Sequence, residues 1–284
     1  MELRKFKIIG AAAIFTAVLA LNSCQKEKAL APKVTESSTP VTEQNLNVVT
    51  TYNEVLTIIE AARSGRSFKT EDVLNDCAVI TIDSISDPHT ILVDFGTGCV
   101  SSDGIFRSGT MYAEFNVNSK QSFKATTGAY INATMSNYVV DDKRYNGPVN
   151  VTNDGPNVRG NLEFPVSMGV TIENIPAGTT ASINSSTTFE WLTGSSTGTR
   201  EDDQLSLIGT MNGVTKDGDS YTASQVTPII INRAAGCDYP VSGEMQYQIG
   251  SGSVHYINYG TGTCDDEATE TVDGNTTTIY LSQQ

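Results

Sequence analysis

From Val79 onward, short stretches in which apolar and polar residues alternate recur between turn residues, and this rhythm constrains the fold more than any other feature of the chain. In residues 110–117, for example, Met111 and Ala113 flank Tyr112, as expected for a strand with one buried and one solvated face. Gly, Asn, Asp, Ser and Thr separate such stretches at intervals of about eight to twelve residues. The sequence therefore predicts an all-β body of consecutive antiparallel strands, built as a sandwich or as barrel-like sheets, and it excludes a parallel α/β sheet.

The segment that precedes these strands divides into two parts. Residues 24–48 are rich in Lys, Glu, Ser, Thr and Pro, a composition that favours a flexible tether. In residues 52–63, Val55 and Ile58 share one face at helical spacing, which predicts one short N-terminal helix docked on the strands. The folded body is accordingly expected to span residues 49–284.

The first residues have the layout of an export signal. Three basic residues among the first seven precede an apolar run at 8–21, which is too short for a comfortable membrane span. The run ends in Leu-Asn-Ser-Cys, which resembles the lipobox of bacterial lipoproteins, where a Leu three residues before a Cys directs lipid attachment to the thiol. The resemblance implies a signal peptide over residues 1–23 and a mature chain that begins at Cys24, carries diacylglycerol there and binds the membrane through it. The alternative is an ordinary secretory signal with a chance cysteine.

Charge limits the partners of the body. The chain carries 18 Lys and Arg against 32 Asp and Glu, a net charge of −14, so its surface repels nucleic acid and anionic lipid head groups. Beyond the first apolar run, no stretch of the sequence approaches transmembrane length. We therefore expect a body that binds no nucleic acid and that meets the membrane only at its N-terminus.

Besides Cys24, four cysteines remain, an even number in a chain bound for an oxidising compartment. Four cysteines allow three pairings. Cys77 and Cys99 flank one predicted hairpin, and Cys237 and Cys264 flank another, so folding either hairpin brings its two sulfurs together. The sequence thus predicts two disulfide-closed hairpins.

The two cysteine hairpins look like copies of one unit. Residues 94–99 read Asp-Phe-Gly-Thr-Gly-Cys and residues 258–264 read Asn-Tyr-Gly-Thr-Gly-Thr-Cys. Ten residues after the cysteine, both copies continue with a glycine and a strand. The body is therefore either one large domain or two lobes, with one copy in 77–117 and the other in 237–282.

Together these features resemble a recurrent group of secreted and outer-membrane lipoproteins of Bacteroidota. The shared features are the lipobox, the short helix, the first hairpin ending in Asp-Phe-Gly-x-Gly-Cys, the Gly-punctuated strands and a closing Tyr-Gly-x-Gly-x-Cys. The group has no assigned activity, so the resemblance implies a compartment and a domain type and carries over no catalytic residue. It implies a lipid anchor in the outer membrane, with the body either in the periplasm or exposed at the cell surface. The charged residues 25–28 are similar to tags that send such lipoproteins to the outer face, or they belong to an ordinary tether.

Candidate chemistry in the body is sparse. His89 and His255 lie on separate predicted hairpins, and no Gly-x-Ser-x-Gly elbow occurs, so we assign no catalytic residue and no cofactor other than the lipid. The acidic clusters 201–203 and 265–267 lack the alternating spacing of a calcium loop and are interpreted as solvated turns, with a calcium site built from distant loops as the alternative. Trp191 is expected in the core, with an exposed sugar-stacking platform as the alternative.

Three functional classes follow. We expect a non-enzymatic protein of the cell envelope that binds or displays a ligand, or that has a structural role. The second class is a glycan-binding accessory lipoprotein of nutrient uptake. The third is an envelope hydrolase, which would need a cleft that gathers two carboxylates, or His255 with a Ser and an Asp.

Overall fold

The computed structural model describes residues 36–37, 39–64, 74, 77–101, 104–117, 121–140, 142–197, 202–237 and 239–281. All of them belong to the unit Thr35–Gln284, one of two compact units into which the chain divides. Strands dominate this unit, so the predicted all-β class is confirmed. The signal peptide predicted over 1–23 and the lipidation site predicted at Cys24 lie outside the described residues.

All sixteen strands belong to one sheet. Its strand order is β1-β16-β15-β14-β13-β12-β11-β10-β9-β7-β6-β5-β3-β2, while β4 pairs with β5 and β8 with β9. Neighbouring strands pair antiparallel, except that β1 and β16 are parallel. The strands are β1 (Glu36–Ser37), β2 (Val79–Asp83), β3 (His89–Asp94), β4 (Cys99–Val100), β5 (Phe106–Phe115), β6 (Tyr130–Val140), β7 (Lys143–Thr152), β8 (Gly155–Pro156), β9 (Leu162–Asn174), β10 (Thr179–Thr193), β11 (Gln204–Val214), β12 (Ser220–Asn232), β13 (Pro240–Ile249), β14 (Val254–Thr261), β15 (Glu267–Val272) and β16 (Asn275–Tyr280).

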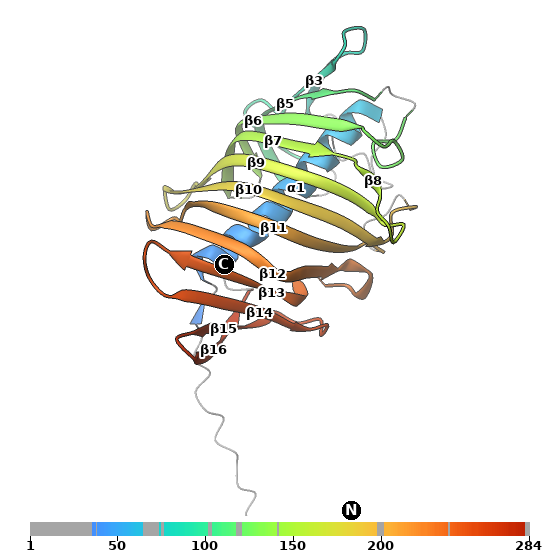
Figure 1. Ribbon diagram of the computed structural model, residues 1–284. Helices are drawn as coiled ribbons and strands as arrows, with labels where there is room; N and C mark the ends of the chain where they lie inside the picture. The colour runs from blue at the N-terminus through green and yellow to red at the C-terminus, as the bar shows by residue number, and fades with distance from the viewer. Residues whose placement is uncertain are drawn as a thin grey trace, which may run out of the picture. The chain divides into compact units, whose positions relative to one another are not determined.

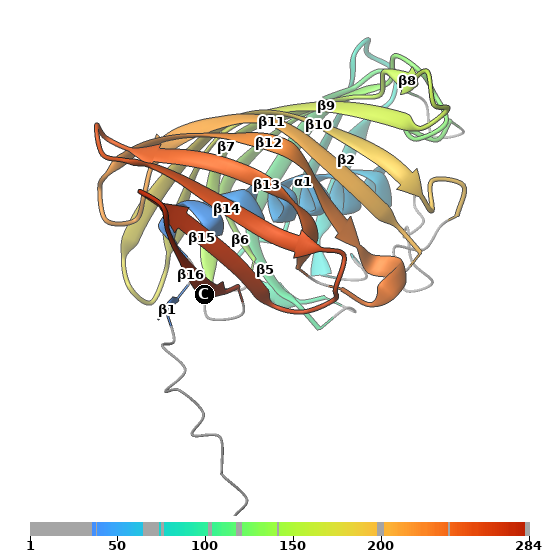
Figure 2. The ribbon, with the colours of Figure 1, turned by 60° about the horizontal axis from the view of Figure 1, so that its bottom comes forward.

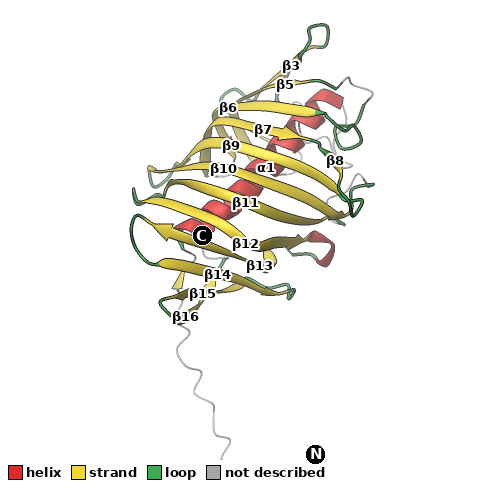
Figure 3. Ribbon diagram, in the orientation of Figure 1, coloured by secondary structure: helices red, strands yellow, loops and turns green. Residues whose placement is uncertain are grey.

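The sheet is strongly curved and wraps around α1 (Pro40–Ser64), as Figure 2 shows. Figure 1 looks onto the convex face, with α1 behind the strands, and Figure 3 shows the same view with the helix in red and the strands in yellow. The all-β body was predicted as a sandwich or as barrel-like sheets, and the structure shows one curved sheet. Its strand pairing continues from β2 to β16, so the two cysteine hairpins, predicted over 77–117 and 237–282, lie in one sheet and not in separate lobes.

The helix differs from its prediction at its N-terminal end. It begins at Pro40 and not at residue 52, so residues 40–48, predicted as part of the tether, are helical. Thr39 Oγ1 accepts a hydrogen bond from the Thr42 N–H at 3.3 Å, and Pro40 takes the first helical position, where its missing N–H leaves no bond unmade. The start signals of the helix therefore lie within the segment whose polar composition indicated a tether.

Contacts with distant strands explain why this polar segment folds. Asn45 Nδ2 donates to the Tyr259 hydroxyl at 3.4 Å. Glu43 lies 3.6 Å from Lys143 Nζ, at the start of β7, and 3.4 Å from Lys216 Nζ, in the turn between β11 and β12. Because a buried polar group is costly unless it is paired, these bonds allow α1 to be enclosed along its polar side as well as its apolar side.

The core lies between α1 and the concave face of the sheet. Tyr52 of α1 stacks on Phe189 of β10, with ring centroids 4.0 Å apart. On β5, Met111 and Ala113 are fully buried while Tyr112 between them is 39% exposed. The alternation predicted for residues 110–117 is confirmed, with apolar residues facing the helix and polar residues facing outward.

Both predicted disulfides are confirmed. Cys77 pairs with Cys99 and Cys237 with Cys264, with Cα atoms 5.7 and 5.5 Å apart. In each hairpin the two cysteines lie beyond the ladder that joins its own two strands: the β2–β3 ladder ends at the pair Val79 and Asp94, and the β13–β14 ladder ends at the pair Ser242 and Thr261. The bonds therefore close the open ends of the hairpins and do not link directly opposed strand residues.

The resemblance between the two hairpins extends to the turn that follows each of them. Asp94 Oδ1 accepts a hydrogen bond from the Gly96 N–H at 2.8 Å, and Asn258 Oδ1 accepts one from the Gly260 N–H at 2.9 Å. The likeness ends beyond the cysteines. Of the two glycines ten residues later, Gly109 lies at a bulge inside β5, whereas Gly274 lies in the β15–β16 turn.

Candidate functional site

A buried ion pair links α1 to the concave face of the sheet. Arg107 of β5 is 1% exposed, and its Nε lies 2.6 Å from Glu54 Oε1 of α1. The Tyr138 hydroxyl donates to the same oxygen at 2.5 Å. Burial, together with the negative charge of Glu54, raises the pKa of Tyr138 well above its usual value, so the phenol keeps its proton. These groups fix α1 to the sheet and leave no charged group on the concave face available for a ligand at this point.

A second polar cluster involves His255, one of the two histidines considered as a catalytic base. His255 Nδ1 lies 2.8 Å from Glu270 Oε1, and the Tyr247 hydroxyl donates to that same oxygen. The Tyr247 and His255 rings stack with centroids 4.6 Å apart. Burial and the bond to Glu270 raise the pKa of Tyr247. A hydrolase based on His255 was expected to need a Ser and an Asp, and the structure brings Glu270 and Tyr247 to this ring instead.

The other histidine does not join this cluster. His89 begins β3 and tilts against Phe115 of β5, with ring centroids 5.6 Å apart. The sheet order places β3 near one end and β14, which carries His255, near the other.

Trp191 is 5% exposed, so its predicted place in the core is confirmed and the alternative of an exposed platform at this residue is excluded. Its Nε1 donates to Asp203 Oδ1 at 2.9 Å, and Lys124 Nζ lies 3.9 Å from the ring centroid. Burial raises the pKa of Asp203, against the opposing effect of the Trp191 hydrogen bond. Asp203 was expected in a solvated turn; that expectation is wrong because its carboxylate is needed to satisfy the buried indole N–H.

Two other residues of the acidic clusters, Asp202 and Asp265, accept hydrogen bonds within local turns. Asp202 Oδ1 accepts from the Thr197 hydroxyl at 2.9 Å, and Asp265 Oδ1 accepts from the Glu267 N–H at 3.1 Å. Glu201 lies outside the described residues. Within the described part of the chain, no three His, Cys, Asp or Glu side chains are grouped so that they could hold a metal ion.

The convex face carries a different kind of surface. One row of register partners crosses the sheet from β6 to β14, and each member faces the same side as its neighbours. The members of this row are Asn132, Asn150, Ser167, Ser186, Thr210, Ser224, Gln246 and Tyr256. A parallel row on the same face consists of Asn184, Asn212, Thr222, Gln248 and Val254. The centre of the convex face thus presents amides and hydroxyls without charge, although the chain as a whole is strongly acidic.

The convex surface has a depression where these two rows cross β11 to β14. The hollow, which we call the outer groove, has a volume of about 380 Å³. Tyr256 and Val254 are 41% and 40% exposed there. The outward-facing residues that line the outer groove are Thr210, Asn212, Thr222, Ser224, Gln246, Gln248, Val254 and Tyr256, and the buried residues Met211, Ala223 and Tyr247 lie beneath them. No member of this set carries a charge, so the groove offers hydrogen bonds and one aromatic ring.

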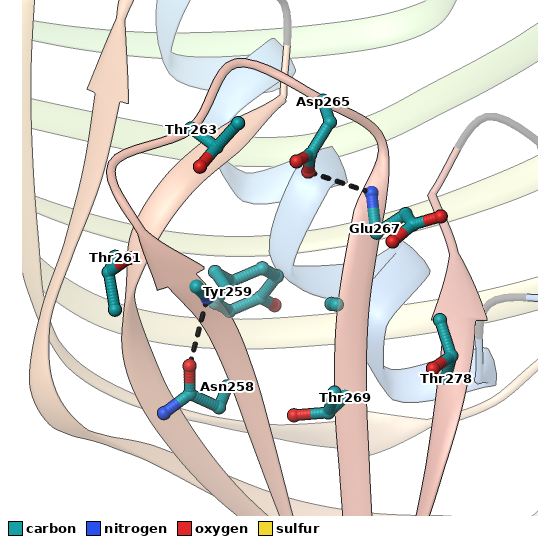
Figure 4. Close-up of a pocket in the computed structure, with 10 residues that line it drawn as sticks. Asn258, Tyr259, Thr261, Thr263, Asp265, Glu267, Thr269 and Thr278 are labelled. Carbon is teal, nitrogen blue, oxygen red and sulfur yellow. Dashed lines mark hydrogen bonds between the residues drawn. The ribbon is translucent and has the colours of Figure 1, made fainter.

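A smaller pocket lies over β14, β15 and β16, with a volume of about 250 Å³. Figure 4 shows Tyr259 among its lining residues, with threonines and acidic residues around it. The threonines that line it are Thr261, Thr263, Thr269 and Thr278. Asp265 and Glu267 also line this pocket, so it differs from the outer groove in carrying negative charge.

In the sequence, the outward-facing Thr and Asn residues of each strand have the pattern of ordinary solvated positions. Nothing in it indicated that they form continuous rows, because the rows depend on the register between many strands. Among the described residues, no helix has both the length and the apolar character to cross a membrane. Comparisons of the chain with protein-family models, with curated proteins and with solved structures found no match.

Proposed function

We propose that this chain is an exported lipoprotein anchored in the outer membrane by diacylglycerol on Cys24, with its body in the periplasm or at the cell surface. The lipobox-like segment supports the anchor, and two disulfides fit an oxidising compartment. The body acts without enzymatic activity, by binding or displaying a ligand. Its partners are the membrane, through the anchor, and a ligand on the outside of the sheet.

One observation carries the proposal for the body. In curved sheets a ligand often occupies the hollow interior, but here α1 fills that interior, with Tyr52, Val55, Ile58 and Ile59 fully buried. The surface left for a partner is the convex face with its loops. That face is polar and uncharged across its centre, which suits a binding or display module.

Lipid anchoring is tested by intact mass spectrometry of the full chain after expression in a bacterium that processes lipoproteins. We expect cleavage before Cys24, a mass increase from diacylglycerol, and recovery in the membrane fraction. The variant Cys24→Ser serves as the control and should be recovered unacylated. An unmodified Cys24 in the wild-type chain would contradict the anchor.

Ligand binding is tested by a screen of glycans and of envelope proteins, with and without calcium. The full chain is the proper sample, because the folded body begins before residue 49: α1 starts at Pro40. We expect the ligand to bind at the convex face, so a probe attached to that face should interfere with its binding. Hydrolysis of a screened glycan or peptide by the purified chain would instead favour the hydrolase class and would refute a purely binding role.

A further inference from the structure

We propose that the outer groove is a binding site for a neutral glycan chain. This inference rests on the proposed function and narrows it, because it names the class of ligand and the residues that recognise it. Four properties of the groove support this assignment: its charge, its hydrogen-bonding groups, its aromatic ring and its extent across the sheet.

The charge of the groove excludes ligands that are recognised through ions. The chain has a net charge of −14, yet the groove is lined only by uncharged residues. A phosphate, sulfate or uronate group would find no cation there and would be repelled by the acidic protein as a whole. A cationic ligand would find no carboxylate in the groove to pair with.

Hydrogen-bonding groups in the groove suit sugar hydroxyls, which both donate and accept. Gln246 Nε2 donates to Ser224 Oγ at 3.2 Å, and Gln248 Nε2 donates to the Gly252 carbonyl at 2.7 Å. These bonds orient the two amides and leave an oxygen of each as an acceptor. Asn212 Oδ1 accepts a weak bond from Asn184 Nδ2 at 3.5 Å, so its Nδ2 remains a donor. The groove therefore presents oriented acceptors and a donor side by side.

Tyr256 supplies the apolar contact that neutral sugars also need. Its ring is 41% exposed and lies opposite Gln246 in the strand register, while Val254 lies opposite Gln248. An exposed aromatic ring flanked by amides offers a flat face to the C–H groups of a sugar and polar groups to its hydroxyls.

The extent of the groove favours a chain over a single sugar. It crosses four neighbouring strands, β11 to β14, and the three intervals between them span about 14 Å at the usual strand spacing. The register row that runs through it continues with uncharged residues across β10, β9, β7 and β6. A polysaccharide can therefore extend along the convex face beyond the groove without meeting a charged side chain in that row.

The test is affinity electrophoresis and calorimetry of the full chain in detergent, with dextran, mannan, soluble starch and arabinoxylan as neutral probes and polygalacturonate as the acidic probe. We expect the wild-type chain to bind at least one neutral probe with little dependence on salt, and not to bind polygalacturonate. Tyr256→Ala should weaken binding by roughly tenfold, the loss expected for one aromatic contact. Asn212→Ala should weaken it as well.

Tyr112→Ala is the matched control, because Tyr112 is 39% exposed on the same convex face but lies on β5, outside the groove. It should change affinity less than twofold. Binding to none of the neutral probes, or binding that Tyr256→Ala leaves unchanged, would overturn the inference. Binding of a protein partner at the convex face instead of a glycan would also overturn it, yet would leave the proposed binding role standing. A wild-type chain that lacks the lipid would contradict the proposed anchor. The polysaccharide-binding assay would still decide whether the outer groove binds a neutral glycan.

Discussion

At the scale of single residues, Arg107 depends strongly on a partner, because its charged guanidinium is almost completely enclosed between α1 and the sheet. A buried ion pair contributes little net stability, because the loss of hydration offsets the attraction, but removal of one partner leaves an uncompensated charge. Glu54 therefore fixes where α1 sits along the sheet, and the Tyr138 hydroxyl reinforces it. No local pattern in the sequence indicates this pairing, because its partners are 53 residues apart.

Glu54→Gln should lower the free energy of unfolding by about 3 kcal/mol, since the Arg107 charge stays buried without its counter-charge. Urea unfolding followed by circular dichroism measures this change. Glu173→Gln is the control, because the pair of Glu173 with Arg144 has both side chains 35% exposed and should contribute less than about 1 kcal/mol. Equal losses in the two variants would contradict the structural role assigned to Glu54.

Glu190 predicts a dependence of stability on pH. Burial opposes its ionisation, but hydrogen bonds from Asn161, Asn157 and Arg159 outweigh this effect and lower its pKa. A carboxyl whose pKa is lower in the folded state stabilises the fold above its unfolded pKa of about 4.3, and this contribution is lost as the pH falls through the folded pKa. Glu190→Gln should therefore be less stable than the wild type at pH 7, and the difference should shrink below about pH 4.3. A difference that grows on acidification, measured by urea unfolding across this range, would refute the assignment.

At the scale of elements, the strands could be predicted and half of the helix could not. Alternation is a local signal, and it placed the outward and inward residues of β5 correctly. The first half of α1 carries the buried residues Asn45 and Asn47, for which distant strands supply hydrogen-bond partners. Such partners cannot be read from a local pattern, so a buried helix with a polar side has the composition of a tether.

Val48→Ala tests this correction. Val48 is 2% exposed in α1, within the segment predicted as a tether, and loss of two buried methyl groups should cost about 2 kcal/mol of unfolding free energy. Val226→Ala on β12 is the matched control, because Val226 is 46% exposed and should lose less than about 1 kcal/mol. If denaturant titrations showed no loss for Val48→Ala, residues 40–48 would not be part of the core.

At the scale of the whole molecule, the disulfide plan followed from the sequence because each pair closes a hairpin of neighbouring strands. The single curved sheet, the position of the helix inside it and the neutral rows of the convex face did not follow, since they depend on how many strands join and in which register. The outer groove illustrates this: its lining residues come from four strands, and each alone reads as an ordinary solvated position.

Each disulfide should stabilise the body to a similar extent, because the paired cysteines are 22 and 27 residues apart. The loop-closure model gives about 3 kcal/mol for either. Replacing Cys77 and Cys99 together by Ala, or Cys237 and Cys264 together, should lower the free energy of unfolding by comparable amounts. Peptide mapping without reduction checks the pairing directly, and a peptide linking the first hairpin to the second would contradict it.

The enclosure of α1 by the sheet is the claim on which the outward-facing site depends, and hydrogen–deuterium exchange on residues 40–49 of the full chain tests it most directly. Backbone amides from Glu43 to Val49 should exchange as slowly as those of the central strands β9 and β10, because all of them are released only by opening of the whole core. The exposed turn at 250–253 provides the fast-exchanging reference. Exchange of the helical amides as fast as in that turn would show that α1 is not enclosed. The concave face of the sheet would then be open to a ligand.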